Sequence, residues 1–388
     1  MKNAYFDHSA TTPVDPRVAT VIYNMLTDNY GNPSSVHQWG RQAREAIDNA
    51  RQQVANLIGA TPAEIVFTSG GTEADNLAII GSIKASTKPG KHLITSAIEH
   101  HAVLDTFHYL EKEGYEVTVL PVNSYGLVEL SQLRAAIRED TIFISIMHAN
   151  NEIGTIQPLA EIGKLTKAHG ILFHTDAVQS AGRIPIAVTE LGVDLLTLSA
   201  HKFYGPKGVG ALYLRKGVKL LPLVHGGGQE RKWRSGTENV PGIIGLGKAA
   251  ELARLEMADR TLHLNSLASY LSQGILDSIP DASLTGHPEL RLPGHTSFVF
   301  SGVEGESMLI MLDLQGIAAS SGSACTSGSL DPSHVLIALG LKHEVAHGSL
   351  RLTLGKDNTI EQIDQLLAVL PGIVSRLREM SPIYKKGV

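Results

Sequence analysis

The sequence predicts an α/β fold with a large domain on a mostly parallel sheet and a smaller α+β domain. The first observation is that seven short runs rich in Val, Ile and Leu alternate with stretches of helical spacing from about residue 64 to 215. This alternation is typical of crossover units in a mostly parallel sheet. The expected strands are 64–68, 92–96, 116–121, 141–147, 171–175, 194–199 and 209–214. The expected helices between them are 72–84, 102–113, 131–138 and 159–169.

The second observation is a long helical pattern after the sheet region. Apolar residues recur at helical spacing over 243–276, and no proline interrupts this run before Pro280, which predicts one long helix or two that could connect two domains. The pattern then changes to a shorter mix of strands and helices, which indicates a small α+β domain. Its expected elements are strands 296–300 and 349–354 and helices 306–314 and 359–377. We expect the large domain to span 15–255 and the small domain to combine 1–14 with 256–388.

The composition limits the classes of function. The 388 residues carry a formal net charge of −5 with no basic stripe, so nucleic acid is not expected as a direct partner. No apolar run approaches the roughly 18 residues of a membrane-spanning helix, and the N-terminus lacks the order of a secretory signal, so we expect no membrane association and a cytoplasmic location. The single cysteine excludes an internal disulfide, a four-cysteine zinc site and an iron–sulfur cluster held by one chain, and no metal site is predicted.

A glycine pair after the first strand can bind an anion. Gly70 and Gly71 lead from the strand at 64–68 into Thr72, where a helix is expected. Glycines let a backbone approach closely, and free N–H groups at a helix N-terminus bind an anion such as phosphate. An ordinary capped helix with Glu73 in its first turn gives the same pattern. Both interpretations stay open for this motif alone.

Two later strands deliver reactive side chains. Asp176 follows the strand at 171–175, and a carboxylate at that edge of an α/β sheet can keep a pyridinium nitrogen protonated, although strand-end Asp residues also cap helices. Lys202 follows the strand at 194–199. Burial and a neighbouring cation would lower its pKa and allow it to form a Schiff base, whereas a solvated lysine is the alternative.

The three features together favour pyridoxal phosphate (PLP) as the cofactor. If the crossover interpretation holds, Asp176 and Lys202 lie at the same edge of the sheet as the glycine pair. They then supply a partner for the ring nitrogen, a lysine for the aldehyde and a cradle for the phosphate, which are the groups PLP needs.

The sequence also resembles the NifS/IscS-type cysteine desulfurases, which are fold-type I PLP-dependent transferases of the class V aminotransferase family. The resemblance covers almost the whole chain, and several independent motifs occur in the family's order. The matching segments are 5–12, 31–37, 71–76, 99–100, 150–154, 176–179, 199–202, 234–237 and 321–328.

The resemblance implies a role for each matched residue around the cofactor. Lys202 would carry PLP, Asp176 would face the pyridine nitrogen and Gln179 would contact the ring hydroxyl. His100 would stack on the ring and carry protons. The residues that would bind the phosphate are Gly71, Thr72, Ser199, His201 and, from the partner subunit of a homodimer, Thr237.

Two further residues would contact the substrate. Asn151 would sit beside the cofactor, and Arg351 would pair with the substrate carboxylate through its planar fork of donors. A surface salt bridge is the alternative for Arg351. The sequence departs from the family at His101, where lysine is expected in bacterial housekeeping members, so the contact made by this residue is left undefined.

Cys325 is the expected nucleophile. A lone cysteine is usually a small buried hydrophobe, but the small and polar residues of 320–329 suit an accessible, mobile loop better than a core. A thiolate there can act as a nucleophile. The resemblance implies that Cys325, Lys202 and His100 convert L-cysteine to L-alanine, with the sulfur held on Cys325 as a persulfide. An acceptor such as an iron–sulfur scaffold protein would then take the sulfur.

Two other classes of function remain open. An aminotransferase or a selenocysteine lyase would share every cofactor residue, but an aminotransferase would need no thiol and should consume a keto acid. A catalytically silent sulfur-trafficking or scaffold protein would more often have lost Lys202 or Cys325, and this chain retains both.

Overall fold

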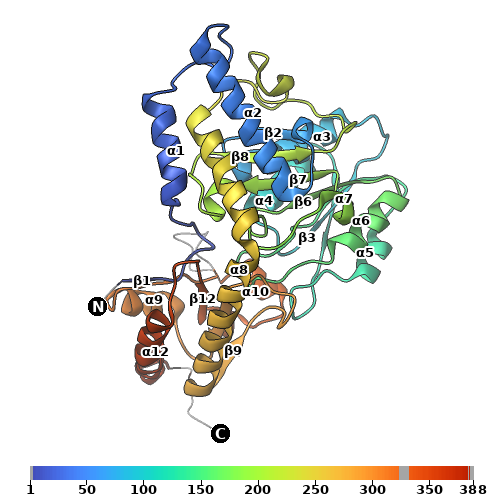
Figure 1. Ribbon diagram of the computed structural model, residues 1–388. Coiled ribbons are helices and arrows are strands. Elements are labelled where there is room, and N and C mark those ends of the chain that lie inside the picture. The colour runs from blue at the N-terminus through green and yellow to red at the C-terminus, as the bar shows by residue number, and fades with distance from the viewer. Residues whose placement is uncertain (1–2, 323–331, 383, 385–388) are drawn as a thin grey trace.

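A seven-stranded sheet forms the centre of the larger part of the molecule (Figure 1). The computed structural model describes residues 3–322, 332–382 and 384. The strand order is β2-β8-β7-β6-β5-β3-β4, and only β8 runs antiparallel to its neighbours. All seven predicted strands are present, and the predicted mostly parallel sheet is confirmed. The strands are β2 (Ile65–Thr68), β3 (His92–Ser96), β4 (Glu116–Leu120), β5 (Thr141–Ser145), β6 (Leu172–Asp176), β7 (Leu195–Ser199) and β8 (Gly210–Leu214).

Helices cover both faces of this sheet, because central parallel strands are apolar on both sides. The sheet has a separate apolar core on each face. Two neighbouring residues of β2 show this, since Phe67 packs in one core and Val66 packs in the other. The Val66 face is covered by α3 (Gly71–Ala85) and α4 (His101–Lys112). The Phe67 face is covered by α1 (Pro16–Thr27), α2 (Gln38–Ile58), α5 (Leu130–Ala136), α6 (Leu159–Ala168), α7 (Val188–Leu191) and the first half of α8 (Val240–Ser278).

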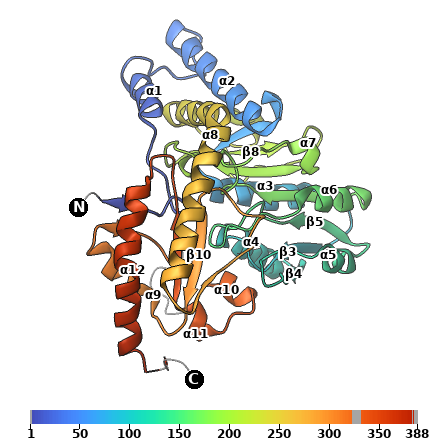
Figure 2. The same cartoon turned by 60° about the horizontal axis from the view of Figure 1, so that its bottom comes forward.

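The long helical pattern forms one continuous helix. Helix α8 has 39 residues and runs from beside α1 and α2 into the smaller part of the molecule (Figure 1). In the smaller part it packs against α12 (Ile360–Met380), and Figure 2 shows the two helices side by side. A second apolar core gathers around its later turns, with Leu267 and Leu271 fully covered.

The smaller part is a mixed α+β unit, as predicted. Its three-stranded antiparallel sheet has the order β12-β10-β9, and β1 pairs in parallel with β11. Ala4 and Phe6, near the N-terminus, belong to its core. The domain boundary near residue 255 falls inside α8 and stays a prediction. The elements are β1 (Ala4–Tyr5), β9 (Ala282–Leu284), β10 (His295–Phe300), α9 (Gly305–Asp313), β11 (Ile317–Ala318), α10 (His334–Ala338), α11 (His343–Ala346) and β12 (Ser349–Thr353).

Across the described residues, no helix combines the length and the apolar character needed to cross a bilayer.

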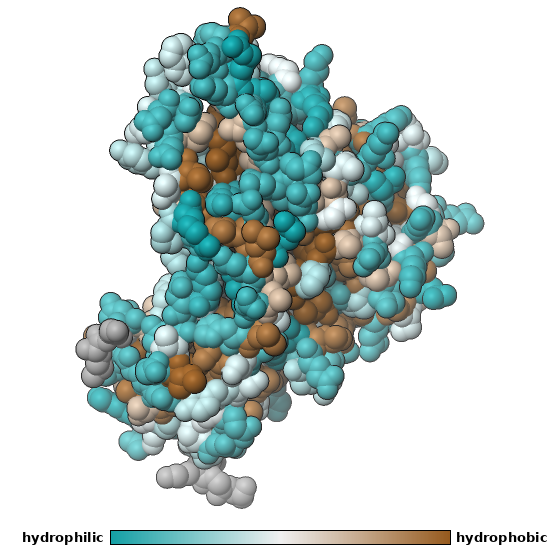
Figure 3. Space-filling view, in the orientation of Figure 1, coloured by the Kyte–Doolittle hydropathy of each residue, from teal (hydrophilic) through white to brown (hydrophobic). Residues whose placement is uncertain are grey.

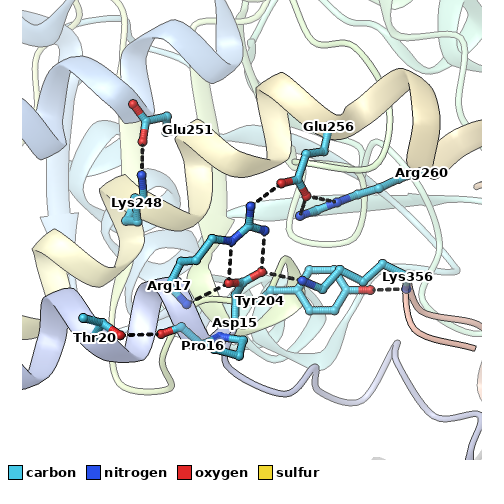
Figure 4. Close-up of polar contacts among 10 residues, drawn as sticks. All are labelled: Asp15, Pro16, Arg17, Thr20, Tyr204, Lys248, Glu251, Glu256, Arg260 and Lys356. Atoms are coloured by element: carbon cyan, nitrogen blue, oxygen red, sulfur yellow. Dashed lines mark hydrogen bonds and ion pairs between the residues drawn. The ribbon is translucent and has the colours of Figure 1, made fainter.

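A buried carboxylate connects the two parts of the molecule (Figure 4). Asp15, the N-cap of α1, has a side chain only 1% exposed and accepts hydrogen bonds from Arg17 Nη2 at 2.8 Å and from Lys356 Nζ. Arg17 also pairs with Glu256 of α8 at 2.6 Å. The Lys356 ammonium lies over the ring of Tyr204. Hydrogen bonds from Arg17, followed by Lys356, hold the pKa of the Asp15 carboxyl well below its usual range even though burial opposes this.

We expect Asp15→Asn to lower the free energy of unfolding by roughly 2 kcal/mol at pH 7, because it leaves two cations without their shared partner. A carboxyl with a depressed folded-state pKa stabilises above its unfolded pKa of about 4 and loses this effect as the pH falls. Urea unfolding should therefore show a smaller difference between parent and variant at pH 3 than at pH 7. Asp140→Asn, at an exposed pair with Arg138, is the control and should change stability far less than Asp15→Asn does. An equal loss of stability in both variants would contradict the role of Asp15 as the shared partner of Arg17 and Lys356.

Candidate active site

A pocket of about 300 Å³ opens at the edge of the sheet where the parallel strands end. It brings together ten of the residues singled out from the sequence: Gly71, Thr72, His100, Asn151, Asp176, Gln179, Ser199, His201, Lys202 and Arg351. Five further residues complete its wall: Ser9, Ala10, Asp75, Met147 and Val178. The pocket therefore collects residues from the ends of β6 and β7, from the N-termini of α3 and α4, from the N-terminal segment and from the middle of β12.

Asp176 and Lys202 meet because β6 and β7 are parallel neighbours. Asp176 ends β6 and pairs with Thr197 of β7. Strand β7 ends two residues later at Ser199, and a 3-10 turn over Ala200–Lys202 brings the lysine into the pocket wall. The crossover interpretation of the sequence thus places both side chains at one edge.

Asp176 is buried at the base of the pocket, with 5% of the residue exposed. Its Oδ1 accepts a hydrogen bond from the Val178 N–H at 2.8 Å. Burial raises the pKa of Asp176, while the nearby His100 and Lys202 charges act in the opposite direction. A proton or a cation placed next to this carboxylate would therefore stabilise it.

Asp75 is a second buried carboxyl in the pocket wall, and sequence reasoning gave it no role. Burial, reinforced by the Asp176 charge, raises its pKa well above the usual value. Its Oδ1 lies 3.6 Å from Nε2 of His174, whose pKa burial lowers to about 3, so this imidazole is neutral. The one sequence feature that could have indicated a role for Asp75 was its place in the motif 71–76, in the first turns of α3.

The N-terminal segment supplies contacts for Lys202. Its Nζ donates to the backbone carbonyl oxygens of Ser9 at 2.5 Å and Ala10 at 3.0 Å. Gln179 Nε2 donates to the same Ser9 carbonyl at 3.0 Å, which leaves Gln179 Oε1 buried without a hydrogen-bond partner. These carbonyls come from nearly 200 residues earlier in the chain, and the sequence offered only the resemblance over 5–12 as a sign of them.

The glycine pair forms the anion-binding end of the pocket. Helix α3 begins at Gly71 after Gly70, which has no side chain to cap the first N–H groups, so these donors remain available for an anion. A Cβ atom on Gly71 would lie 2.9 Å from Val178 Cγ2, whereas one on Gly70 would meet nothing within 4 Å. His201 borders this end, and burial followed by the Lys202 charge lowers the pKa of His201 to about 4, so it is neutral at pH 7.

His100 is positioned by the helix that it caps. Its Nδ1 accepts a hydrogen bond from the Ala102 N–H at 3.1 Å at the start of α4, which leaves Nε2 for the pocket. Burial lowers the pKa of His100. The neighbouring His101 does not line this pocket; its ring centroid lies 4.9 Å from that of His334.

Arg351 enters the site from the smaller part of the molecule. It lies in the middle of β12 and is 2% exposed, so the alternative of a surface salt bridge is wrong. Its Nη2 donates to Asp7 Oδ1 at 2.8 Å and its Nη1 to the Asn151 carbonyl at 3.1 Å. Its Nε is buried without a partner, so this donor remains for an acceptor in the pocket.

Among the predicted site residues that the structure describes, Thr237 alone does not line the pocket. It is exposed, and the adjacent Gly236 has a left-handed φ of 112°. Cys325 lies outside the described residues. The chain leading toward it passes the site, because Ser320 exchanges backbone hydrogen bonds with Arg351 at 2.7 and 3.3 Å.

The wall of the pocket fits PLP. A lysine amine, a buried carboxylate and a helix N-terminus lie in one cavity, and they match the aldehyde, ring nitrogen and phosphate of that cofactor. The unpartnered Oε1 of Gln179 and Oδ1 of Asp75 are buried polar atoms that a ligand could satisfy.

The fold and the pocket together define a PLP-dependent α/β enzyme. The sequence model described as aminotransferase class-V matches residues 4–366, and the chain belongs to this family, whose members depend on PLP.

Relatives match over the full length of the chain. A Methanosarcina thermophila protein named cysteine desulfurase IscS is 56% identical over 99% of this chain and 95% of its own. A Dictyoglomus turgidum protein of the same name is 54% identical over 99% of this chain and 98% of its own. A solved structure named NifS-like protein superposes with a TM-score of 0.91 at 41% identity, covering 96% of this chain and all of its own. The structure titled SspA in complex with cysteine gives a TM-score of 0.80 at 38% identity, covering 92% of this chain and all of its own.

The two glycines provide a matched test of the anion-binding end. We expect Gly71→Ala to weaken PLP retention about tenfold or more, because the added methyl group meets the stiff, β-branched Val178 at the wall of the pocket. Gly70→Ala should retain PLP like the parent, because its Cβ points into open space. The measurement is the cofactor absorbance that remains after dialysis, with circular dichroism as a check on folding. Equal retention in the two variants would show that Gly71 does not shape the cofactor site.

Proposed function

We propose that the protein is a cysteine desulfurase that converts L-cysteine to L-alanine and holds the sulfur as a persulfide on Cys325. The observation that carries this proposal is that Arg351, in the wall of the PLP-type pocket, pairs with Ser320. Cys325 is only five residues further along the chain, and five residues span at most about 17 Å. The thiol is therefore tethered within reach of a substrate at Arg351. The relatives named cysteine desulfurase IscS support the same activity.

In this proposal the cofactor is held by the residues that line the pocket. Lys202 would bind the aldehyde carbon, Asp176 would face the ring nitrogen and keep it protonated, and Gln179 would contact the ring hydroxyl. When bound, PLP supplies an electron sink for bond changes at the substrate α-carbon. The phosphate is bound at the N-terminus of α3 by Gly71, Thr72, Ser199 and His201, with Thr237 added by the partner subunit.

The substrate is oriented by Arg351 and Asn151. The Nε–H of Arg351 has no partner, and the bonds to Asp7 and to the Asn151 carbonyl use only one hydrogen of each Nη group, so donors remain for the carboxylate of L-cysteine. Lys202 Nζ then removes the proton from the substrate α-carbon as general base. His100 carries protons on the other side, with Nε2 as the exchanging atom because Nδ1 is occupied by the helix cap.

Sulfur transfer follows at Cys325. Its thiolate attacks the substrate sulfur, so that a sulfur–sulfur bond forms as the bond between this sulfur and the β-carbon breaks. The electron pair of the broken bond stays on the β-carbon and takes up a proton, which gives the methyl group of alanine. The net change is one sulfur atom moved from L-cysteine to Cys325, with no external oxidant or reductant required.

The proposal also includes a homodimer and a sulfur-acceptor protein such as an iron–sulfur scaffold in the cytoplasm. Thr237 lies away from the pocket of its own chain, which suits a residue that serves the partner's site. Large apolar side chains are exposed on the first two helices and the loop between them, including Val36 at 88% and Leu26 at 62%. Figure 3 shows apolar side chains exposed on a face that is otherwise largely hydrophilic. Such surfaces are typical of protein interfaces.

The role of Cys325 separates this proposal from other PLP chemistry. We expect Cys325→Ala to bind PLP, to shift the cofactor spectrum when L-cysteine is added, and to release sulfide at least about 100-fold more slowly than the parent, because only the sulfur nucleophile is lost. Ser327→Ala, two residues away, is the control and should keep its activity. Sulfide and alanine are measured from L-cysteine with a reductant present. If Cys325→Ala matches the parent rate, a lyase that does not use the thiol becomes the better assignment.

The role of Thr237 tests the composite site. Thr237→Ala should weaken PLP binding several-fold and leave the dimer intact, whereas Thr189→Ala on α7 should change neither PLP binding nor the dimer. Sedimentation gives the assembly state and PLP titration gives the affinity. A fully active monomer at assay dilution would rule out a contribution from the partner.

A further inference from the structure

An acidic residue lies in the first turn of the helix that forms the anion-binding end of the pocket. Glu73 is the third residue of α3, and its neighbour Thr72 lines the pocket. A carboxylate in a first helical turn is attracted to the same free N–H groups that bind a phosphate, and its charge repels that phosphate. The phosphate of PLP is largely dianionic at pH 7, so an uncompensated carboxylate here would oppose cofactor binding.

Arg234 holds this carboxylate outside the helix. Its Nε donates to Glu73 Oε1 at 2.8 Å, and its Nη2 donates to Glu73 Oε2 at 3.3 Å. Glu73 Oε2 also accepts at 2.8 Å from the N–H of Ser69, which precedes the N-cap residue Gly70. Burial alone would raise the pKa of Glu73, but the hydrogen bonds from Arg234 and then Ser69 lower it, so the group is ionised at pH 7. Both oxygens are therefore engaged by donors outside α3.

The loop that carries Arg234 is fixed to β2, the strand that leads into the glycine pair. Glu230 is buried and accepts from both Nη groups of Arg51 at 2.7 and 2.8 Å and from the Phe67 N–H of β2 at 3.0 Å. Residues 230–232 have left-handed φ angles of 43°, 57° and 69°, which cost energy for residues with side chains. Such a turn persists only where its surroundings hold it, and the buried Arg51–Glu230 pair does so. Arg234 is thus presented by a fixed loop.

We propose that Arg234 is a positioning residue that neutralises Glu73 and holds its carboxylate away from the N-terminus of α3, so that the phosphate of PLP can bind there. The proposal rests on the assignment of the phosphate to this helix end, and not on the role of Cys325 or of a partner subunit. Arg234 touches neither cofactor nor substrate in this account. The motif 234–237 then contains, besides Thr237, a residue that acts on the site of its own chain.

Removal of the charge on Arg234 separates this role from that of a purely structural ion pair. Arg234→Met keeps a long side chain but leaves Glu73 unpaired, and we expect it to bind PLP at least about fivefold more weakly than the parent. Its affinity for pyridoxal, which lacks the phosphate, should match that of the parent. Adding Glu73→Gln to Arg234→Met should return PLP affinity to within about twofold of the parent, because the charge that repels the phosphate is gone.

Full-length holoenzymes dialysed to equilibrium against graded concentrations of PLP or pyridoxal give the two affinities by absorbance. Inorganic phosphate, added as a competitor of PLP, reports the anion site itself, and its inhibition constant should rise in Arg234→Met. Arg215→Met, whose pair with Asp194 lies outside the pocket, is the control and should leave both affinities unchanged. Equal losses for PLP and pyridoxal in Arg234→Met, or a double variant as weak as Arg234→Met, would overturn the proposal.

Glu73→Gln alone supplies a second arm of the test. It removes the repelling charge and keeps an oxygen that can accept from Ser69, so it should bind PLP at least as tightly as the parent. Weaker binding would overturn the proposal, and this arm decides if Arg234→Met does not fold. A parent protein that binds pyridoxal as tightly as PLP would show that no phosphate is held at α3, and the proposal would fall with that assignment. The role of Cys325 is tested separately by sulfide release.

Discussion

The parallel pairing of β6 with β7 is the constraint on which the rest of the site depends. Parallel neighbours end at the same edge of a sheet, so the residues that follow them must lie close together however far apart they are in sequence. The register pairs Asp176 with Thr197, and the turn after Ser199 then presents Lys202. A slip of one residue in this register would move the carboxylate to the opposite face of the sheet. The glycine pair after β2 faces the same edge, which completes the three groups that fit PLP.

The smaller part of the molecule and the N-terminal segment supply pocket groups that do not come from the large sheet. Arg351 on β12 lines the pocket, and the carbonyls of Ser9 and Ala10 accept hydrogen bonds from Lys202 in its wall. The Asp15 network holds this part in place, since Asp15 connects α1, Lys356 and, through Arg17, helix α8. Chemistry at the pocket therefore depends on packing between elements that are hundreds of residues apart in the chain.

Much of this arrangement could be predicted from the sequence. The seven strands follow from their apolar runs, and Asp176 and Lys202 could be placed at one edge because crossover connections leave few alternatives. Helix α8 could not be distinguished from two shorter helices, because it runs from one part of the molecule into the other and the pattern contains no signal at the boundary. The site assignments for Thr237 and Cys325 remain predictions, since the first depends on a second subunit and the second lies outside the described residues.

The site residues whose roles could not be predicted from the sequence were missed for one physical reason. Asp75 and Ser9 act through contacts with residues that are distant in sequence, and no local propensity reports such contacts. Asp75 was visible only as part of a motif, although its burial beside Asp176 changes the electrostatics of both carboxyls.

The central claim is that the edge formed by β6 and β7 presents Lys202 as the attachment point for PLP. Borohydride reduction of the purified holoenzyme, followed by peptide mapping, tests it most directly. The account predicts that PLP is fixed covalently on the peptide that contains Lys202 and that Lys202→Ala abolishes this labelling while the fold is retained. Labelling of a different lysine in the parent protein would contradict the account.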